Sequence, residues 1–261
     1  MIFPAQIPKW VKWIYPRFIW QIAKEEKSIY LTFDDGPHPR ITPIVLALLS
    51  KYNAKATFFC IGDRVNRYPE IFEQLKAEGH AVGNHTQQHL NGWKTNTEDY
   101  LSDVEKANAI IQSNLFRPPY GRIKQSQSRL LIKKGYKIVM WTILSADYDK
   151  NIAKEVCSAR VTDNIENGMI YLFHDSEKAN PRCGSRTSPG GWNPSHRGLQ
   201  HASRGPRGGR VDFRVTREPR PCPLGFGPDL GFRESPTLDL HWLGQIRAGR
   251  SCRHARGNAP R

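Results

Sequence analysis

Long apolar runs are missing from this sequence of 261 residues. No stretch approaches the roughly 20 apolar residues that a transmembrane helix needs, so we expect no membrane span. The first twenty residues also lack the order of a secretory signal, because basic residues and prolines interrupt every apolar run. We therefore recognise no targeting segment, and the compartment stays open between the cytoplasm and the periphery of a membrane.

Paired cysteine motifs are missing as well. The five cysteines are odd in number, and their spacings match no CxxC or other metal or redox signature. We therefore expect free thiols, and the cysteines indicate no oxidising compartment. They are Cys60, Cys157, Cys183, Cys222 and Cys252.

Lysine is absent from the last third of the chain. Residues 181–261 hold 15 Arg and no Lys, together with 13 of the 21 Gly and 10 of the 19 Pro. Gly and Pro at this density oppose a packed core, so we predict a disordered tail or the product of a changed reading frame. The tail carries +10 of the formal net charge of +15, which leaves a domain of ordinary composition at residues 25–180.

Aromatic and basic residues gather in the first segment, residues 1–24. One interpretation is that the aromatic rings rest on a bilayer surface, as in interfacial segments of this composition, which would give a peripheral contact with a membrane. Packing of the rings against the domain is the interpretation we favour. The aromatic residues are Trp10, Trp13, Tyr15, Phe18 and Trp20.

Strand-like and helix-like segments alternate between residues 28 and 174. Apolar runs predict strands at 28–33, 56–61, 80–83, 136–141 and 169–173, and a further strand ending near Arg117. Thr42 predicts the N-cap of a helix that begins at Pro43, and other helices begin at Pro69, at Thr97 and near residue 126. This alternation predicts βα units and a mostly parallel sheet.

Polar residues stand where the predicted strands end. In parallel α/β sheets and barrels the active site lies at the carboxyl ends of the strands, so we expect these side chains to lie close together at that end of the sheet. They are Asp34, Asp35, His85, Arg117, Asp147 and His174.

The spacing of two histidines predicts a metal site. His85 and His89 lie four residues apart, which on a helical turn places both imidazoles on one face. One carboxylate added to them makes a three-ligand site of the kind that catalytic zinc prefers. Asp34 and Asp35 are adjacent, and in extended backbone they point opposite ways, so one can bind the metal while the other receives a proton.

Each of these features also has a purely structural interpretation. An HxxxH pair alone is more often a structural pair or a pair on the protein surface. The prolines beside Arg117 and Tyr120 are also typical of a rigid structural turn. His174 could be a hydrogen-bonded strand end, and Asp147 the cap of a following helix. Asn84 begins a glycosylation sequon, which we discount because a glycan there would obstruct the predicted site.

Five segments in order resemble the motifs of the polysaccharide deacetylases, the NodB-homology domain of carbohydrate esterase family 4. They are TFDDGP at 32–37, HTQQH at 85–89, RPPYG at 117–121, DY at 147–148 and LFHD at 172–175. The resemblance covers about residues 25–180. It implies an α/β fold, a distorted parallel (β/α) barrel, and hydrolysis of N-acetyl groups on glycans that contain N-acetylglucosamine (GlcNAc), such as peptidoglycan, chitin or chitooligosaccharides.

The resemblance also implies a role for each motif residue. A divalent ion, zinc in most of the family with cobalt or nickel as alternatives, would be held by Asp35, His85 and His89. Asp34 would be the general base, and Arg117 would keep it ionised and oriented. His174 would protonate the leaving amine, with its imidazole held by Asp147.

The remaining roles concern the substrate. The backbone N–H of Tyr120 would stabilise the oxyanion, and Leu172 would line the acetyl pocket. The fourth motif usually carries Trp after the Asp, whereas this chain has Tyr148, so Tyr148 or Trp141 would form the aromatic wall. No segment after residue 180 resembles the helix and strand that complete the family's barrel, so we expect those closing elements to be lacking.

Two other functions stay open at this point. One is an inactive barrel that binds sugars without hydrolysing them. The other is nucleic-acid binding through the arginine- and glycine-rich tail, although no repeat accompanies it. The deacetylase interpretation predicts a monomer whose partner is an N-acetylated glycan, with no nucleic acid.

Overall fold

The computed structural model describes residues 4–22, 28–179, 213–214 and 246–248. Its main strands are β1 Ser28–Asp34, β2 Thr57–Cys60, β3 Ala81–Asn84, β4 Leu115–Phe116, β5 Lys137–Ile138, β6 Ile143–Leu144 and β7 Ile170–His174. Its helices are α1 Lys9–Ile14, α2 Ile41–Lys51, α3 Gly62–Arg67, α4 Pro69–Ala77, α5 Thr97–Ile111, the 3-10 turn η1 Pro119–Gly121, α6 Gln125–Lys133 and α7 Lys154–Thr162.

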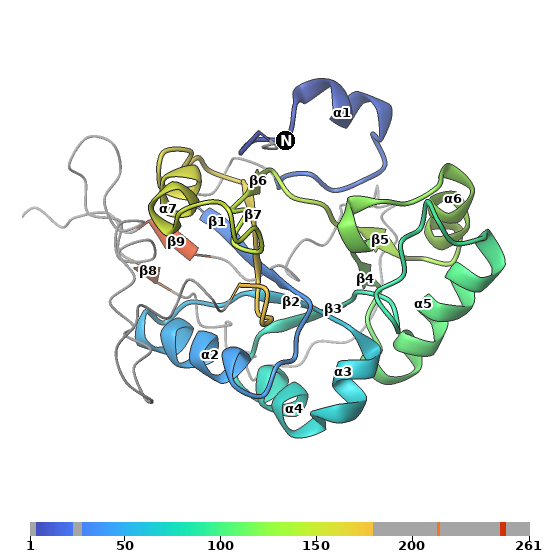
Figure 1. Ribbon diagram of the computed structural model, residues 1–261, viewed down its shortest axis with the longest axis horizontal. Helices are drawn as coiled ribbons and strands as arrows, with labels where there is room; N and C mark the ends of the chain where they lie inside the picture. The colour runs from blue at the N-terminus through green and yellow to red at the C-terminus, as the bar shows by residue number, and fades with distance from the viewer. Residues whose placement is uncertain (1–3, 23–27, 180–212, 215–245, 249–261) are drawn as a thin grey trace, which may run out of the picture.

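The main strands form one curved sheet in the order β5-β4-β3-β2-β1-β7-β6, and every pair along that path is parallel. Figure 1 shows helices α2 to α6 around the outside of this sheet, with α4 between α2 and α3. The predicted parallel sheet of βα units is therefore confirmed. All carboxyl ends of these strands consequently lie at one end of the curved sheet, where the site forms.

The central strands are buried on both faces of the sheet, which explains why their sequences are unbroken apolar runs. β2 is buried along its whole length, and Phe58 and Phe59, which point to opposite faces, have no exposed surface. On one side Phe58 belongs to a cluster with Leu46 and Leu75 from the outer helices α2 and α4. On the other side Phe59 packs with the residues enclosed by the curve of the sheet.

The N-terminal segment lies between the two ends of the sheet. Ile19 donates its backbone N–H to Ile138, and Met140 donates to Ile19, each at 2.8 Å. Three residues later Ile22 donates to Gly168 at 2.8 Å, beside the start of β7. Residues 18–22 thus connect the segment around β5, at one end of the strand order, with the start of β7, the strand next to the other end.

The aromatic residues of this segment divide into two groups. Phe18 and Trp20 are buried in a cluster with Tyr100 and Phe116, as predicted. Trp10 and Trp13 on α1 are 60% and 83% exposed, so the prediction that they pack against the domain is wrong. None of the helices in the described part of the chain is both long and apolar enough to span a membrane.

One local prediction needs correction, and some short elements were not predicted. Helix α2 begins at Ile41 with Arg40 as its N-cap, so Thr42 is not the cap. The hydroxyl group of Thr42 instead accepts the backbone N–H of His38 and donates to Asp175, which ties two loops together. Helix α3 and strand β6 were not predicted, because each is too short to show a period in sequence.

The predictions about the tail fall almost wholly outside the described residues, and so do the expected missing closing elements. The exceptions are β8 Phe213–Arg214 and β9 Ile246–Ala248, which the tail sequence does not predict. They pair with each other in antiparallel fashion, and β9 also pairs with the start of β1. Cys60 and Cys157, both buried, are not joined in a disulfide, in agreement with the prediction for these two residues.

Candidate metal and acid–base site

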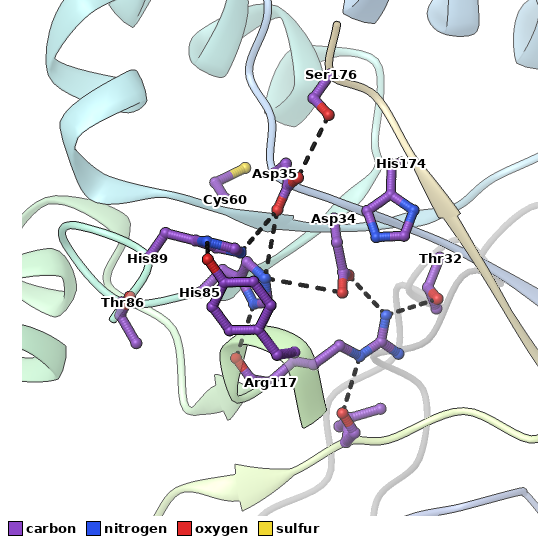
Figure 2. Close-up of polar contacts among 12 residues, drawn as sticks. Thr32, Asp34, Asp35, Cys60, His85, Thr86, His89, Arg117, His174 and Ser176 are labelled. Carbon is purple, nitrogen blue, oxygen red and sulfur yellow. Dashed lines mark hydrogen bonds and ion pairs between the residues drawn. The ribbon is translucent and has the colours of Figure 1, made fainter. Parts of the chain in front are cut away.

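The polar residues at the strand ends come together at one place. Asp34 ends β1 and pairs in register with His174, which ends the neighbouring strand β7. His85 follows β3, and Arg117 follows β4. Figure 2 shows Asp34 between Arg117 and His85, with His89 and His174 on opposite sides of it.

Three of these side chains have the geometry of a metal site. Each of Asp35, His85 and His89 offers one ligand atom, and these atoms all lie within 4.8 Å of one another. Oδ1 of Asp35 lies 3.6 Å from Nε2 of His85 and 3.1 Å from Nε2 of His89. Bonds of about 2.1 Å in a tetrahedral arrangement separate ligand atoms by about 3.4 Å. The two distances from Asp35 are close to this value, so the three side chains could hold one divalent ion.

The two histidines do not share a helical turn, contrary to the sequence prediction. Residues 85–90 form a loop after β3, in which Thr86 and His89 have φ values of 66° and 57°. Asn84 supports the first of these conformations, because its side-chain oxygen accepts the N–H of Thr86 at 2.8 Å. The imidazoles still approach each other, with ring centroids 5.1 Å apart.

One neighbouring loop orients both imidazoles. Nδ1 of His85 lies 2.8 Å from the backbone oxygen of Arg117, and Nδ1 of His89 lies 3.1 Å from the hydroxyl of Tyr120. When Nδ1 carries the proton and donates it to such a partner, Nε2 keeps its lone pair for a metal. The RPPYG segment thus fixes the direction in which both Nε2 atoms point.

The electrostatics favour the protonation states that a metal needs. Burial lowers the pKa of His85 to about 4, with a smaller lowering by the nearby His89, although the charge of Asp34 acts to raise it, so the imidazole is neutral at pH 7. Burial alone would raise the pKa of Asp35, but its hydrogen bond to His89 and the adjacent imidazoles bring it well below its usual value. Asp35 is therefore a carboxylate.

Asp35 is not in extended backbone. Its φ of 78° corrects the prediction that Asp34 and Asp35 point opposite ways. Both carboxylates approach Nε2 of His85, at 3.9 Å for Asp34 and 3.6 Å for Asp35. The second oxygen of Asp35 lies 3.3 Å from Ser176 Oγ and 3.3 Å from Lys178 Nζ, which leaves Oδ1 toward the histidines.

Asp34 is held by a fully buried arginine. The guanidinium of Arg117 donates to Asp34 Oδ1 at 2.7 Å and to the hydroxyl of Thr32 at 2.8 Å. Its other nitrogens donate to the backbone oxygens of Val139 at 3.0 Å and Met140 at 2.8 Å. A buried charge is stable only when it is paired and hydrogen-bonded, and Arg117 meets both conditions.

His174 is paired with Asp147 from the loop after β6. Oδ1 of Asp147 lies 2.8 Å from His174 Nδ1, and Oδ2 accepts the backbone N–H of His174 at 2.8 Å. Burial alone would lower the pKa of His174, but the negative charge and hydrogen bond of Asp147, followed by the charges of Asp35 and Asp34, raise it to about 9. The imidazole is therefore an acid at neutral pH.

The predicted substrate-contacting residues lie around these groups. Tyr148 packs edge-on against His174, with ring centroids 5.1 Å apart, and Leu172 is buried on β7. Trp141 lies near Arg117, whose Cζ is 5.9 Å from the indole ring. Tyr120 is 57% exposed, so it stands at the rim.

Several positioning residues were not predicted from the sequence. Asp103 on α5 is buried and accepts the backbone N–H groups of Gln87 at 2.8 Å and Gln88 at 3.2 Å, in the loop between the two histidines. The sequence signal that could have revealed Asp103 is an acidic residue next to the apolar stripe of Tyr100 and Val104. Both side-chain amide atoms of buried Asn84 are also hydrogen-bonded, which agrees with discounting the sequon.

Asp175 supports the loop that carries Asp35. It is fully buried, and its Oδ2 accepts a hydrogen bond from Thr42 at 2.6 Å. A Cβ added at Gly36 would lie 2.1 Å from that same oxygen. Only glycine therefore lets the loop after β1 pass over the Asp175 carboxyl group.

Comparison with known proteins gives consistent results. The polysaccharide deacetylase family profile matches residues 21–139. A peptidoglycan-N-acetylglucosamine deacetylase of Bacillus cereus is 38% identical over 162 residues, covering 60% of this chain and 76% of the relative. A chitooligosaccharide deacetylase of Azorhizobium caulinodans is 34% identical, covering 59% and 77%.

Solved structures agree with the sequence relatives. The crystal structure of the Bc1960 peptidoglycan N-acetylglucosamine deacetylase superposes with a TM-score of 0.59 at 30% identity. It covers 63% of this chain and 79% of that chain. The predicted fold, a curved parallel α/β barrel of this type, is thereby confirmed.

Proposed function

Because this chain belongs to the polysaccharide deacetylase family, we propose that it hydrolyses the N-acetyl groups of GlcNAc residues in a glycan. Peptidoglycan and chitooligosaccharides are the two substrate classes named for its relatives. One observation carries the proposal: the three-ligand set lies beside a carboxylate held by Arg117, and the strand end next to that carboxylate carries an imidazole held by Asp147.

We propose that Asp35, His85 and His89 hold a divalent ion. The distances between their ligand atoms and the oriented Nε2 atoms support this assignment. Two imidazoles and a carboxylate suit Zn²⁺, and Co²⁺ or Ni²⁺ accept the same ligand types. Such an ion supplies Lewis acidity, which lowers the pKa of water to about 7 and polarises a carbonyl.

Asp34 is the proposed general base. Amide hydrolysis begins when water adds to the acetyl carbon, and the water must give up a proton as the new C–O bond forms. Arg117 holds Oδ1 of Asp34, while Oδ2 lies 3.9 Å from Nε2 of His85, beside the proposed metal ligands. Oδ2 is thus placed to take that proton, and Arg117 fixes the direction of the carboxylate.

His174 is the proposed general acid. The C–N bond breaks only if the sugar nitrogen receives a proton, because an amide anion is a very poor leaving group. His174 carries a proton at neutral pH and keeps its orientation through Asp147. Transfer of that proton releases the free amine, and the acetyl group leaves as acetate.

The remaining predicted residues would contact the substrate. The backbone N–H of Tyr120, in a loop stiffened by two prolines, is the proposed donor to the developing oxyanion. Buried Leu172 would face the acetyl methyl group, and the rings of Tyr148 and Trp141 would border the sugar.

Acetate release from GlcNAc oligomers and from peptidoglycan by the 261-residue chain tests the proposal. We expect release that stops after treatment with a chelator and returns when Zn²⁺ is added. Elemental analysis should find about one bound ion per chain before treatment. Absence of acetate release from both substrates in a folded, metal-loaded protein would favour the inactive sugar-binding alternative.

A further inference from the structure

Two exposed aromatic side chains stand beside the site. Trp93 and Tyr120 are each 57% exposed, whereas most aromatic residues of the described chain are buried. Tyr120 contacts the proposed ligand His89, with ring centroids 4.6 Å apart. Trp93 follows His89 by four residues in the same loop, so their Cα atoms can be at most about 14 Å apart.

The ring of Trp93 is held in place although it is exposed. Its indole Nε1–H donates to the backbone oxygen of Ile123 at 3.2 Å, and the guanidinium of Arg122 lies over the ring at 5.3 Å. The backbone N–H of the preceding residue, Gly92, donates to Arg122 at 3.2 Å. An exposed ring that is fixed in this way loses little conformational freedom when it binds a ligand.

These contacts join two loops that both belong to the site. Trp93 lies in the loop that carries His85 and His89, and Arg122 follows the segment that carries Tyr120. We call Trp93 and Arg122 together the Trp93 platform. The platform therefore belongs to the same two loops that carry His89 and Tyr120.

We propose that the Trp93 platform is a binding subsite for a sugar unit of the glycan that lies at least two units from the GlcNAc that reacts. This inference rests on the proposed function. The apolar C–H face of a pyranose ring packs on the face of an indole, and a guanidinium beside it donates hydrogen bonds to hydroxyl groups. The class of ligand is an extended oligosaccharide or polysaccharide chain, in preference to a single sugar or a disaccharide.

The test compares chain lengths in three variants. We measure kcat/KM for acetate release from a GlcNAc disaccharide and a GlcNAc pentasaccharide with Trp93→Ala, Trp93→Phe and Trp13→Ala. We expect Trp93→Ala to lower the pentasaccharide value by about 3- to 10-fold and to leave the disaccharide value within about twofold. Trp93→Phe, which keeps a ring, should retain most of the preference. Trp13→Ala removes an even more exposed indole from α1 and should change neither value.

Two outcomes would overturn the subsite. One is an equal loss on both substrates with Trp93→Ala, and the other is no loss on either. If the alanine variant does not fold, Trp93→Leu replaces it, because leucine keeps an apolar side chain without a ring. Calorimetric titration with the same two sugars separates this inference from the proposed function, since it detects binding of the pentasaccharide through Trp93 even in a protein that releases no acetate.

Discussion

At the scale of a single residue, Arg117 links the proposed general base to one of the proposed metal ligands. Its side chain pairs with Asp34, and its backbone oxygen lies 2.8 Å from Nδ1 of His85. The side chain has no exposed surface, and it donates hydrogen bonds to residues of β1 and of the segment after β5. A shift of this residue would therefore move the proposed base and a proposed metal ligand together.

Substitution of Asp34 should separate chemistry from metal binding. Asp34→Asn removes the proposed proton acceptor but keeps an oxygen for Arg117, so we expect acetate release to fall by about 10²- to 10⁴-fold. Bound metal should stay near the wild-type content, measured by elemental analysis. His85→Ala is the matched variant, and it should lose the metal as well. Retention of full activity by Asp34→Asn would contradict the assignment of the base.

The pH profile should report on Asp147. His174 must be protonated to act, so activity is present below its pKa and is lost as the pH rises through about 9. Asp147→Asn removes the main cause that raises this pKa, and burial then lowers it, so the alkaline limb of kcat should move to lower pH. A bound cation lowers the pKa in both proteins, so the comparison uses metal-loaded wild type and variant. An unchanged alkaline limb would rule out His174 as the titrating acid.

Residue types could be predicted from the sequence more reliably than their backbone conformations. The five motifs predicted Asp35, His85 and His89 as a set, and the structure brings them together. The helical turn for the histidines was wrong, because the loop uses positive φ at Thr86 and His89 and depends on hydrogen bonds from distant residues. Spacing in sequence cannot reveal such long-range partners.

At the scale of elements, one strand of the parallel sheet escaped sequence analysis. β1 and β7 have seven and five residues, and both were predicted. β6 has only two residues, and it is defined by its pairing with β7 rather than by a local pattern. Its position still matters, because the loop that follows it carries Asp147.

Helix α5 should stabilise the histidine loop through one carboxylate. Asp103→Ala leaves the backbone N–H groups of Gln87 and Gln88 without their acceptor, so we expect the free energy of unfolding to fall by about 1–3 kcal/mol. Zinc affinity should fall too, because this loop connects His85 to His89. Denaturant unfolding and metal titration measure the two effects.

The control for this variant lies next to it in sequence. Ser102 is exposed on the same helix, and Ser102→Ala should change stability by less than about 0.5 kcal/mol. If both variants behaved alike, the hydrogen bonds of Asp103 would have no special role in holding the loop.

At the scale of the whole molecule, a segment from the start of the chain lies where the two ends of the sheet approach each other. Residues 18–22 bond to the segment around β5 and to Gly168 before β7, and their side chains fill the space between. The sequence showed an aromatic segment but not this placement, because the contacts join residues more than a hundred positions apart.

A pair of tryptophans tests that placement. Trp20 is 7% exposed and donates its indole N–H to Tyr15, whereas Trp13 is 83% exposed. We expect Trp20→Ala to lower the free energy of unfolding by about 3–5 kcal/mol. Trp13→Ala should lower it by less than about 0.5 kcal/mol. Equal stability of the two variants in chemical denaturation would show that the segment does not support the fold.

The loop from Arg117 to Tyr120 has a consequence for protein engineering. It contributes no ligand to the proposed ion, yet its carbonyl and hydroxyl groups orient both imidazoles. Transplanting only Asp35, His85 and His89 into a designed scaffold would therefore give rings free to rotate and a weak, unselective site. A designed site would also need this loop and the buried hydrogen-bond acceptors of its arginine.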